Sequence, residues 1–348
     1  MALPTGRSGG AVLATAAGGS SPGRGRHART ARKRSGLSSG RAWLLIAPTL
    51  VILAVVIAYP VLRAVVMSFQ NDAGLDPSTG MFVEGGSAGF SNYTHWILQQ
   101  CTSASGTLVP CPPGTLGSQF WEAVGNTAFF TVVTVSIELV IGFAMAVIMG
   151  KTFAGRALLR AAILIPWAIP TAVTAKLWYF IFAYDGIANK LLGTDILWTG
   201  DAWPARFAVI IADVWKTTPF MALLILAGLQ MIPADVYEAA RVDGASAWQR
   251  FTKITLPLVK PALMVAVLFR TMDALRMYDL PAILTEGNPA TRTISILVVE
   301  QIRQGFNSAA ALSTISFVMI FVVAFILVKF LGANAVATQE DQRKGTVR

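Results

Sequence analysis

The sequence predicts an all-α polytopic membrane protein with six transmembrane helices. Of its 348 residues, 54% are apolar and only 13% are charged, whereas a soluble domain carries about 25% charged residues. The apolar residues are gathered in blocks, and each block approaches the roughly 20 residues that a helix needs to span a hydrocarbon core. A soluble enzyme and a disordered chain are both disfavoured by this pattern.

Six apolar blocks supply one expected span each. They cover residues 43–69, 126–149, 158–182, 207–231, 262–284 and 309–331. The segments outside them are a basic arm at 1–42, a long loop at 70–120, a connection at 232–261 within the five-helix core 121–331, and a tail at 332–348.

The distribution of Lys and Arg predicts the orientation of the spans. Eight basic residues precede the first span, whereas the loop at 70–120 contains none, and the connection at 232–261 contains four. Basic residues beside a span are retained in the cytoplasm. We therefore expect both termini and the connection at 232–261 to be cytoplasmic, and the loop at 70–120 to be extracytoplasmic.

The arm at 1–42 consists mostly of Gly, Ser, Ala and Arg without apolar periodicity. Such a segment buries too little surface to fold, so we expect a disordered arm that helps to set topology. Contact with anionic membrane lipid is an alternative. A nucleic-acid partner is disfavoured, because a bare Arg run offers electrostatic attraction but no base readout.

The only two cysteines, Cys101 and Cys111, lie in a Ser/Thr/Pro-rich part of the loop at 70–120. On the oxidising side of a membrane such a pair favours a disulfide. Two free thiols are the alternative, because sequence spacing alone does not fix the geometry of the two side chains.

The sequence offers no catalytic or metal chemistry. The two histidines, His27 and His95, are isolated from any ligand cluster, which disfavours a metal site. The run from Gly150 to Thr152 ends like a phosphate-binding loop, but Met145 occupies the position of the required earlier glycine. We expect no cofactor bound by this chain, so energy for transport has to come from an ion gradient or a partner.

The connection at 232–261, which we call the EAA segment, carries local folding signals. A helix over 234–242 is predicted, followed by Gly244 in a left-handed conformation. Ser246 and Gln249 have the spacing of a capping box for a second short helix, which Pro257 is expected to end. From these signals alone, an ordinary amphipathic connection is equally acceptable.

The residue pattern resembles the EAA loop of ABC-importer permeases. The residues that carry this resemblance are Glu238, Ala239, Ala240, Asp243, Gly244, Ile254, Leu256 and Pro257. It implies a type I ABC-importer permease fold in the plasma (inner) membrane. It also implies that the helix with Glu238 docks on a separate ATPase subunit, which would hold ATP and Mg.

Two further stretches resemble carbohydrate permeases of the maltose and glycerol-3-phosphate type. The first is 164–170, continuing to Trp178, Gly186 and Asn189. The second is 273–279, followed by Leu284, Thr285 and a turn at 287–289, although Glu286 and Asn288 stand where glycines are more usual. The resemblance implies four kinds of partner: a second permease, two ATPase subunits, an extracytoplasmic sugar-binding protein and a sugar. The implied substrate is a disaccharide such as trehalose.

Charged residues inside the spans are the candidate substrate path. Arg270, Asp273, Arg276 and Asp279 follow one another at three-residue steps in the fifth expected span. Because a charge at a helix centre costs about 2.5–3.5 kcal/mol, these side chains have to face protein or water. Together with polar and aromatic residues of the fourth span they suit a sugar. The candidates are Lys216, Thr217, Phe220, Arg270, Asp273, Ala274 and Tyr278.

Three alternatives remain open from the sequence. The charges can form structural ion pairs between helices, a role that we also assign to Glu138. An ion-coupled secondary transporter would also explain buried charges, although the inverted repeats of such proteins are not evident. A channel would explain the spans but not the EAA segment.

Overall fold

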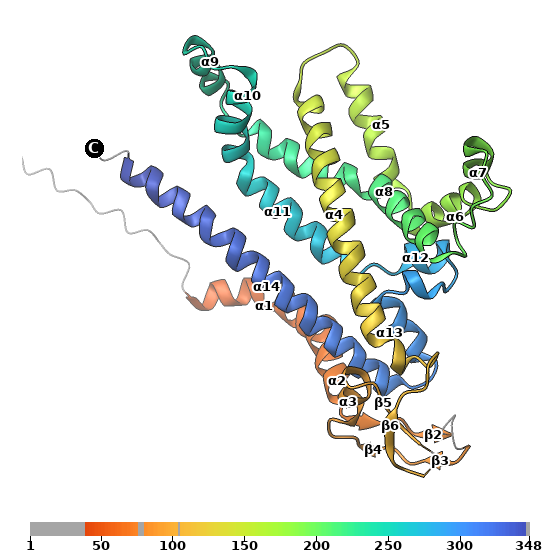
Figure 1. Cartoon of the computed structure of the whole chain (residues 1–348). Coiled ribbons are helices and arrows are strands. Elements are labelled where there is room, and N and C mark those ends of the chain that lie inside the picture. The colour runs from red at the N-terminus through yellow and green to blue at the C-terminus, as the bar shows by residue number, and fades with distance from the viewer. Residues whose placement is uncertain (1–38, 76–79, 104, 346–348) are drawn as a thin grey trace, which may run out of the picture. The chain divides into compact units, whose positions relative to one another are not determined.

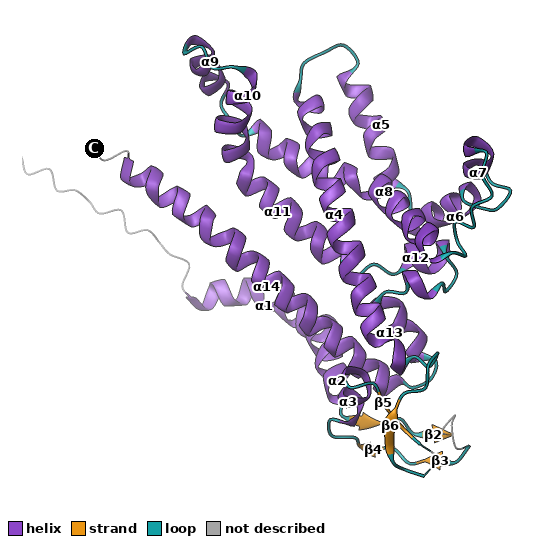
Figure 2. Ribbon diagram, in the orientation of Figure 1, coloured by secondary structure: helices purple, strands orange, loops and turns teal. Residues whose placement is uncertain are grey.

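The computed structural model describes residues 39–75, 80–103 and 105–345, and these are mostly helical (Figures 1 and 2). The chain divides into two compact units, Met1–Val55 and Val56–Arg348. The first unit contains helix α1 (Ser39–Leu53) and the first two residues of the π-helical turn η1 (Ala54–Ala58). All later described elements belong to the second unit. The arm expected at 1–42 lies outside the described residues except for its last four, which begin α1.

Five described helical segments are long and apolar enough to cross a membrane, and a bent pair makes a sixth. This confirms six spans when the bent pair is counted as one. The five segments are Trp43–Met67, Gly117–Gly150, Ala202–Gln230, Ala247–Ala274 and Phe306–Phe330. They contain α2 (Tyr59–Met67), α4 (Phe120–Gly150), α8 (Ala202–Gln230), α11 (Leu256–Ala274) and part of α14 (Phe306–Gly345).

The expectation of one continuous helix over 158–182 is wrong. The chain forms α5 (Arg156–Ala168) and α6 (Thr171–Ile181), which meet at an angle of 92°. Pro170 is the cause, because proline lacks an N–H group and forces the preceding Ile169 into an extended conformation. The Nζ atom of Lys216 donates a hydrogen bond of 2.6 Å to the Ile169 carbonyl oxygen at this break.

The fifth expected span, 262–284, is also interrupted. Helix α11 ends at Ala274, and a short helix α12 (Asp279–Leu284) follows. Arg276 and Tyr278 therefore do not continue the helical row that starts at Arg270, and the expected face shared by Arg270, Asp273, Ala274 and Tyr278 is wrong as a single helical face.

Pro257 begins α11 instead of ending the preceding helix. A π-helical turn, Phe251–Thr255, joins α10 (Ala247–Arg250) to α11 without a break in the helical segment. A proline cannot donate the regular backbone hydrogen bond and its ring crowds the preceding turn, and the wider π turn accommodates both effects. The expectation that Pro257 stops the helix is therefore wrong.

The main helical core lies where α4, α8 and α11 pack together. A small residue on α8, Gly228, allows α11 to come close, because a Cβ atom at this position would overlap the Cβ atom of Ala262. The fully buried members of this core include Ala146, Met149, Met221, Ala222, Ile225, Val259 and Ala266.

The segment at 70–120 departs from the all-α expectation by six short strands in three antiparallel pairs. These are β1 (Gln70–Asn71) with β4 (Gly86–Ser87), β2 (Gly74–Leu75) with β3 (Phe82–Val83), and β5 (Gln100–Thr102) with β6 (Leu108–Pro110). The short helix α3 (Ser91–Ile97) lies between β4 and β5.

Hydrogen bonds fasten this segment to the start of α14. The Asp72 carboxylate accepts bonds from the backbone N–H groups of Asn307, at 2.6 Å, and Ser308, at 3.1 Å. The indole Nε1 of the fully buried Trp96 donates to the Ser308 carbonyl oxygen at 3.1 Å. In the second unit, these strands lie at the end opposite α9 and α10 (Figure 1).

The remaining described elements connect these helices. They are η2 (Gly117–Gln119), α7 (Ile187–Leu192), α9 (Ala234–Val242), η4 (Pro289–Thr291) and α13 (Ile294–Ile302).

The close approach of α8 and α11 predicts a cost for any side chain at position 228. We expect Gly228→Ala to lower the free energy of unfolding by about 1–3 kcal/mol, because the new methyl group overlaps Ala262. Gly125→Ala is the control, since no atom lies within 4 Å of the added Cβ on α4. Thermal unfolding in detergent measures both. A Gly228→Ala variant as stable as the parent would contradict this packing.

Candidate functional site

The EAA segment forms a short helix followed by a tight turn, as the sequence predicts. Helix α9 covers Ala234–Val242, and Gly244 follows it with a φ of +77°. The Ala245 N–H donates to the Ala240 carbonyl oxygen at 2.9 Å, which closes the turn. Ser246 and Gln249 form the expected capping box at the start of α10.

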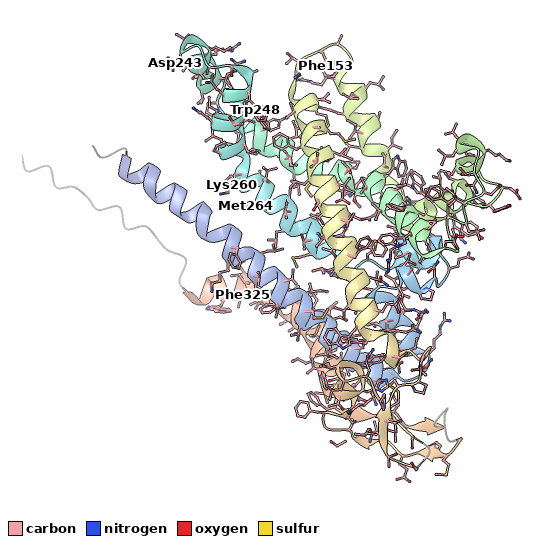
Figure 3. The ribbon with its side chains drawn as sticks, viewed as in Figure 1. Phe153, Asp243, Trp248, Lys260, Met264 and Phe325 are labelled. Atoms are coloured by element: carbon pink, nitrogen blue, oxygen red, sulfur yellow. A yellow bond between two sulfur atoms is a disulfide. The ribbon has the colours of Figure 1, made fainter. Side chains whose placement is uncertain are left out.

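The EAA segment has an exposed surface, and a side-chain contact holds its helix α9 in place. The Tyr237 and Thr255 hydroxyl oxygens lie 2.9 Å apart and hold α9 against the π turn. The Glu238 side chain is 67% exposed and makes only a loose ion pair with Arg241, at 3.8 Å. Figure 3 shows Asp243 and Trp248 at this end of the second unit. Of the other candidates Ala239, Leu256 and Pro257 are exposed, and Ala240 and Ile254 are half-buried.

A buried ion cluster joins the three core helices. Arg270 of α11 is 1% exposed. Its Nε and Nη2 atoms donate to the two carboxylate oxygens of Glu138 on α4, at 2.6 and 3.0 Å, and Nη2 also donates to Asp213 on α8. Its Nη1 atom donates to Asp273 at 3.0 Å. The structural ion pairing that we assigned to Glu138 is present.

The cluster leaves one carboxylate accessible. Glu138 and Asp213 are buried, whereas the Asp273 side chain is 71% exposed. The Thr217 hydroxyl adds a donor, 2.7 Å from Glu138 Oε1. The Arg270 guanidinium is therefore occupied by hydrogen bonds to protein carboxylates, whereas the exposed Asp273 carboxylate can also bind a ligand.

Asp273 faces a polar cavity of about 140 Å³ between α6, α8, α11 and α12. The cavity brings together five of the residues that the sequence suggested for a substrate path, although they come from different elements. These five are Lys216, Thr217, Arg270, Asp273 and Tyr278. Its other lining residues are Thr171, Asp213, Arg276, Met277, Asp279 and Leu280.

Two of the suggested path residues lie elsewhere. Phe220 stacks on Trp167 of α5, with ring centroids 5.9 Å apart, and Ala274 is buried in the helical core. Thr171, Met277 and Leu280 were missed by sequence reasoning. Only the breaks after Ile169 and Ala274 bring these three to the cavity, and no local pattern marks them.

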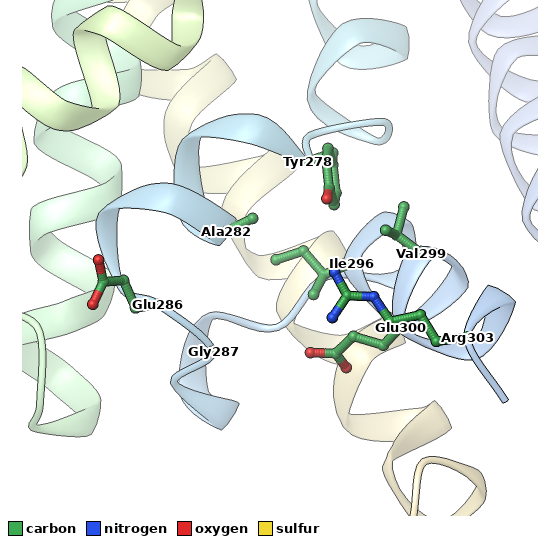
Figure 4. Close-up of a pocket in the computed structure, with 8 residues that line it drawn as sticks. All are labelled: Tyr278, Ala282, Glu286, Gly287, Ile296, Val299, Glu300 and Arg303. Carbon is green, nitrogen blue, oxygen red and sulfur yellow. The ribbon is translucent and has the colours of Figure 1, made fainter.

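A second cavity of about 240 Å³ lies between α12 and α13 (Figure 4). Tyr278 lines both cavities. The remaining lining residues of the second cavity are Ala282, Glu286, Gly287, Ile296, Val299, Glu300 and Arg303.

Glu286, at the rim of this second cavity, has a strained backbone. Its φ of +45° lies in the left-handed region, which costs an L residue about 1–2 kcal/mol. Its Oε1 atom pairs with Lys176 Nζ at 3.1 Å, and the two side chains are 56% and 52% exposed. An exposed ion pair contributes only about 0–1 kcal/mol, so this pair alone does not offset the strain.

The two cysteines form a disulfide, Cys101–Cys111, that closes the β5–β6 hairpin. His95 lies beside it, with its Nδ1 atom 2.8 Å from the Gln100 carbonyl oxygen. Burial lowers the pKa of His95 below its ordinary value, which keeps the ring neutral near pH 7. These three side chains are the one close group of metal-ligand type in the described chain, and the disulfide removes both thiolates from metal binding.

Comparison with known proteins identifies the family. A family model described as binding-protein-dependent transport system inner membrane component matches residues 138–336. The chain belongs to this family. The match begins at Glu138, so it includes every residue of the ion cluster and of the first cavity, together with the EAA segment. The chain is thus a multi-pass permease subunit of the inner membrane, and the family favours an importer over an ion-coupled transporter.

Two curated relatives extend over most of the chain. The trehalose transport system permease protein SugA of Mycobacterium tuberculosis is 39% identical over 297 residues, which are 84% of this chain and 89% of that protein. The trehalose/maltose transport system permease protein MalF of Thermococcus litoralis is 38% identical over 295 residues, or 82% and 92%.

A solved structure supports the fold. A chain of a bacterial ABC transporter involved in alginate import superposes with a TM-score of 0.67 at 21% identity, covering 84% of this chain and 96% of that one. At this identity the likeness concerns the fold alone, which is that of an ABC-importer permease.

The ion cluster predicts a large loss of stability when its guanidinium is removed. We expect Arg270→Gln to cost about 3–5 kcal/mol, because it leaves two buried carboxylates without a counter-charge. Arg276→Gln, at an exposed position, should change stability by less than about 0.5 kcal/mol. Thermal unfolding in detergent gives both values.

A second variant separates charge from packing. Adding Glu138→Gln to Arg270→Gln should recover part of the lost stability, because one stranded charge is removed. Additive losses in the double variant would show that Arg270 acts through packing alone.

Proposed function

We propose that this permease forms half of the translocation path of an ATP-driven importer for a disaccharide such as trehalose. The observation that carries the proposal is the cavity at Asp273, which joins carboxylate, ammonium and hydroxyl groups to the aromatic ring of Tyr278. Sugar hydroxyls need both donors and acceptors, and the C–H face of a sugar ring packs on an aromatic ring. The two relatives named above, a trehalose permease and a trehalose/maltose permease, support a sugar.

The size of the cavity supports a partner permease. Its volume of about 140 Å³ is below the roughly 300–1,000 Å³ of ordinary ligand sites. A site for a disaccharide would therefore be completed by a second permease chain that faces the same polar groups. The Asp273 side chain is 71% exposed in the single chain. In this arrangement it would contact the substrate where the two permease chains meet.

The EAA segment supports coupling to an ATPase. Helix α9 is closed by the turn at Gly244 and held against the π turn by the Tyr237–Thr255 contact, so it can transmit position better than a flexible loop. We assign Glu238 to electrostatic contact with a basic group of the ATPase, and Ala239 and Ala240 to close packing. Two ATPase subunits, each holding ATP and Mg, and an extracytoplasmic sugar-binding protein complete the complex.

The proposed topology places the EAA segment and both termini in the cytoplasm. The loop at 70–120 then lies outside, where the disulfide Cys101–Cys111 is stable against reduction. The absence of Lys and Arg from that loop supports this orientation.

Uptake by the reconstituted complex tests the substrate site. We expect Asp273→Asn to raise the KM for trehalose by about 10- to 100-fold, because a hydrogen bond to a charged group contributes about 1.5–3 kcal/mol. The matched control is Asp195→Asn, which removes an exposed carboxylate outside the cavity. An unchanged KM in assembled Asp273→Asn complex would leave the ion cluster with a structural role only.

Coupling is tested by Gly244→Val. A β-branched residue resists the φ of +77°, so we expect α9 to be misdirected, the ATPase to be lost on purification, and trehalose-stimulated ATP hydrolysis to fall at least tenfold. Gly155→Val imposes the same strain between α4 and α5, at a φ of +88°, and should retain the ATPase. If the Gly244→Val complex retained both the ATPase subunit and the stimulated ATP hydrolysis, the EAA segment would not have the coupling function.

A further inference from the structure

The turn after α12 holds Glu286 in a conformation that glycine would adopt more readily. Among the described residues, only Gln99 and Glu286 combine a side chain with a positive φ. Strained backbone of this kind is retained at sites where the side chain is needed. The exposed ion pair with Lys176 is too weak to be the whole reason, so the carboxylate at this position requires another partner.

The cavity beside Glu286 supplies the setting for that partner. Figure 4 shows Tyr278, Glu300 and Arg303 toward one side of the cavity and Glu286 on the other. The Glu286 carboxylate is turned away from these three side chains and pairs with Lys176. The lining therefore offers an aromatic face, carboxylate acceptors and guanidinium donors, next to the apolar side chains of Ile296 and Val299. This mixture fits a ring that carries several hydroxyl groups and a C–H face.

The position of the cavity links it to the Asp273 cavity. Tyr278 lines both, so the two cavities are neighbours. The α13 helix, which forms the far wall, is tied to the 70–120 segment, because its neighbour Arg292 donates a hydrogen bond to Gln119. In Figure 1, α13 lies between α12 and the end of the second unit that carries the strands, so the second cavity, which α12 and α13 line, is on that side of α12.

We propose that the cavity between α12 and α13 is a second saccharide site, in which Glu286 determines specificity by accepting hydrogen bonds from ring hydroxyls. This proposal rests on the proposed sugar-import function and extends it to an entry site. At about 240 Å³ the cavity is below the roughly 300–1,000 Å³ of ordinary ligand sites, so we assign to it one ring of a disaccharide, with the other ring outside.

Lys176 competes with the sugar for the same carboxylate. Its Nζ atom lies 3.1 Å from Glu286 and 4.6 Å from the ring centre of Tyr179, so the ammonium group keeps an aromatic neighbour when Glu286 turns to the sugar. The ion pair is then the resting state of an empty site.

The test uses the assembled complex and trehalose as the probe. Glu286→Gly removes the carboxylate and the backbone strain together. We expect the melting temperature to stay at or above that of the parent and the KM for trehalose in stimulated ATP hydrolysis to rise at least tenfold. The matched control is Gln99→Gly, which relieves the same kind of strain in the 70–120 segment and should leave the KM unchanged.

A second variant separates the carboxylate from its ion pair. Lys176→Gln removes the competing cation, so it should keep or lower the KM for trehalose, whereas a purely structural ion pair predicts the same defect as Glu286→Gly. A wild-type KM in Glu286→Gly, or equal defects in the two variants, would overturn the second site. If the wild-type complex itself showed no stimulation by trehalose or maltose, the sugar-import function would fall first, and the second site with it.

Discussion

The fold depends on one constraint, which is that the Arg270 guanidinium is buried among apolar helices and has to be paired. An unpaired charge in such a place would cost several kcal/mol, so α4 and α8 each bring a carboxylate to it. These contacts join residues 132 and 57 positions apart in the chain. They hold the three core helices together. Asp273, on the next turn of α11, lines the cavity.

Interruptions of the helices supply further polar groups around the Asp273 cavity. The 92° bend at Ile169 exposes a carbonyl group that Lys216 satisfies, and the break after Ala274 brings Tyr278 to both cavities. Irregular backbone is tolerated at membrane depth where it lines a cavity or is buried in protein. The two breaks and the polar cavity are therefore parts of one arrangement: the breaks provide backbone and side-chain groups that a pair of straight apolar helices would lack.

Local signals made the EAA segment predictable almost residue by residue. The bounds of α9, the positive φ of Gly244 and the Ser246–Gln249 capping box follow from interactions within a few residues. The same reasoning failed at Pro257 and in the fifth expected span. At Pro257 a π turn continues the helix that we expected to end. After Ala274 a helix break interrupts the regular helix that we assumed for the charges at three-residue steps. Both features depend on packing against neighbouring helices.

The sequence by itself determined that the chain is a membrane protein, how many spans it has, and which segment resembles a coupling helix, because hydropathy and capping act over short distances. It also placed Arg270 and Asp273 among the residues that have to face protein or water. Only the tertiary structure decided that Arg270 is held by Glu138 and Asp213 while Asp273 stays accessible, that Phe220 stacks on Trp167, and that Glu286 lines a second cavity. These outcomes depend on contacts between distant parts of the chain, whose geometry no local pattern records.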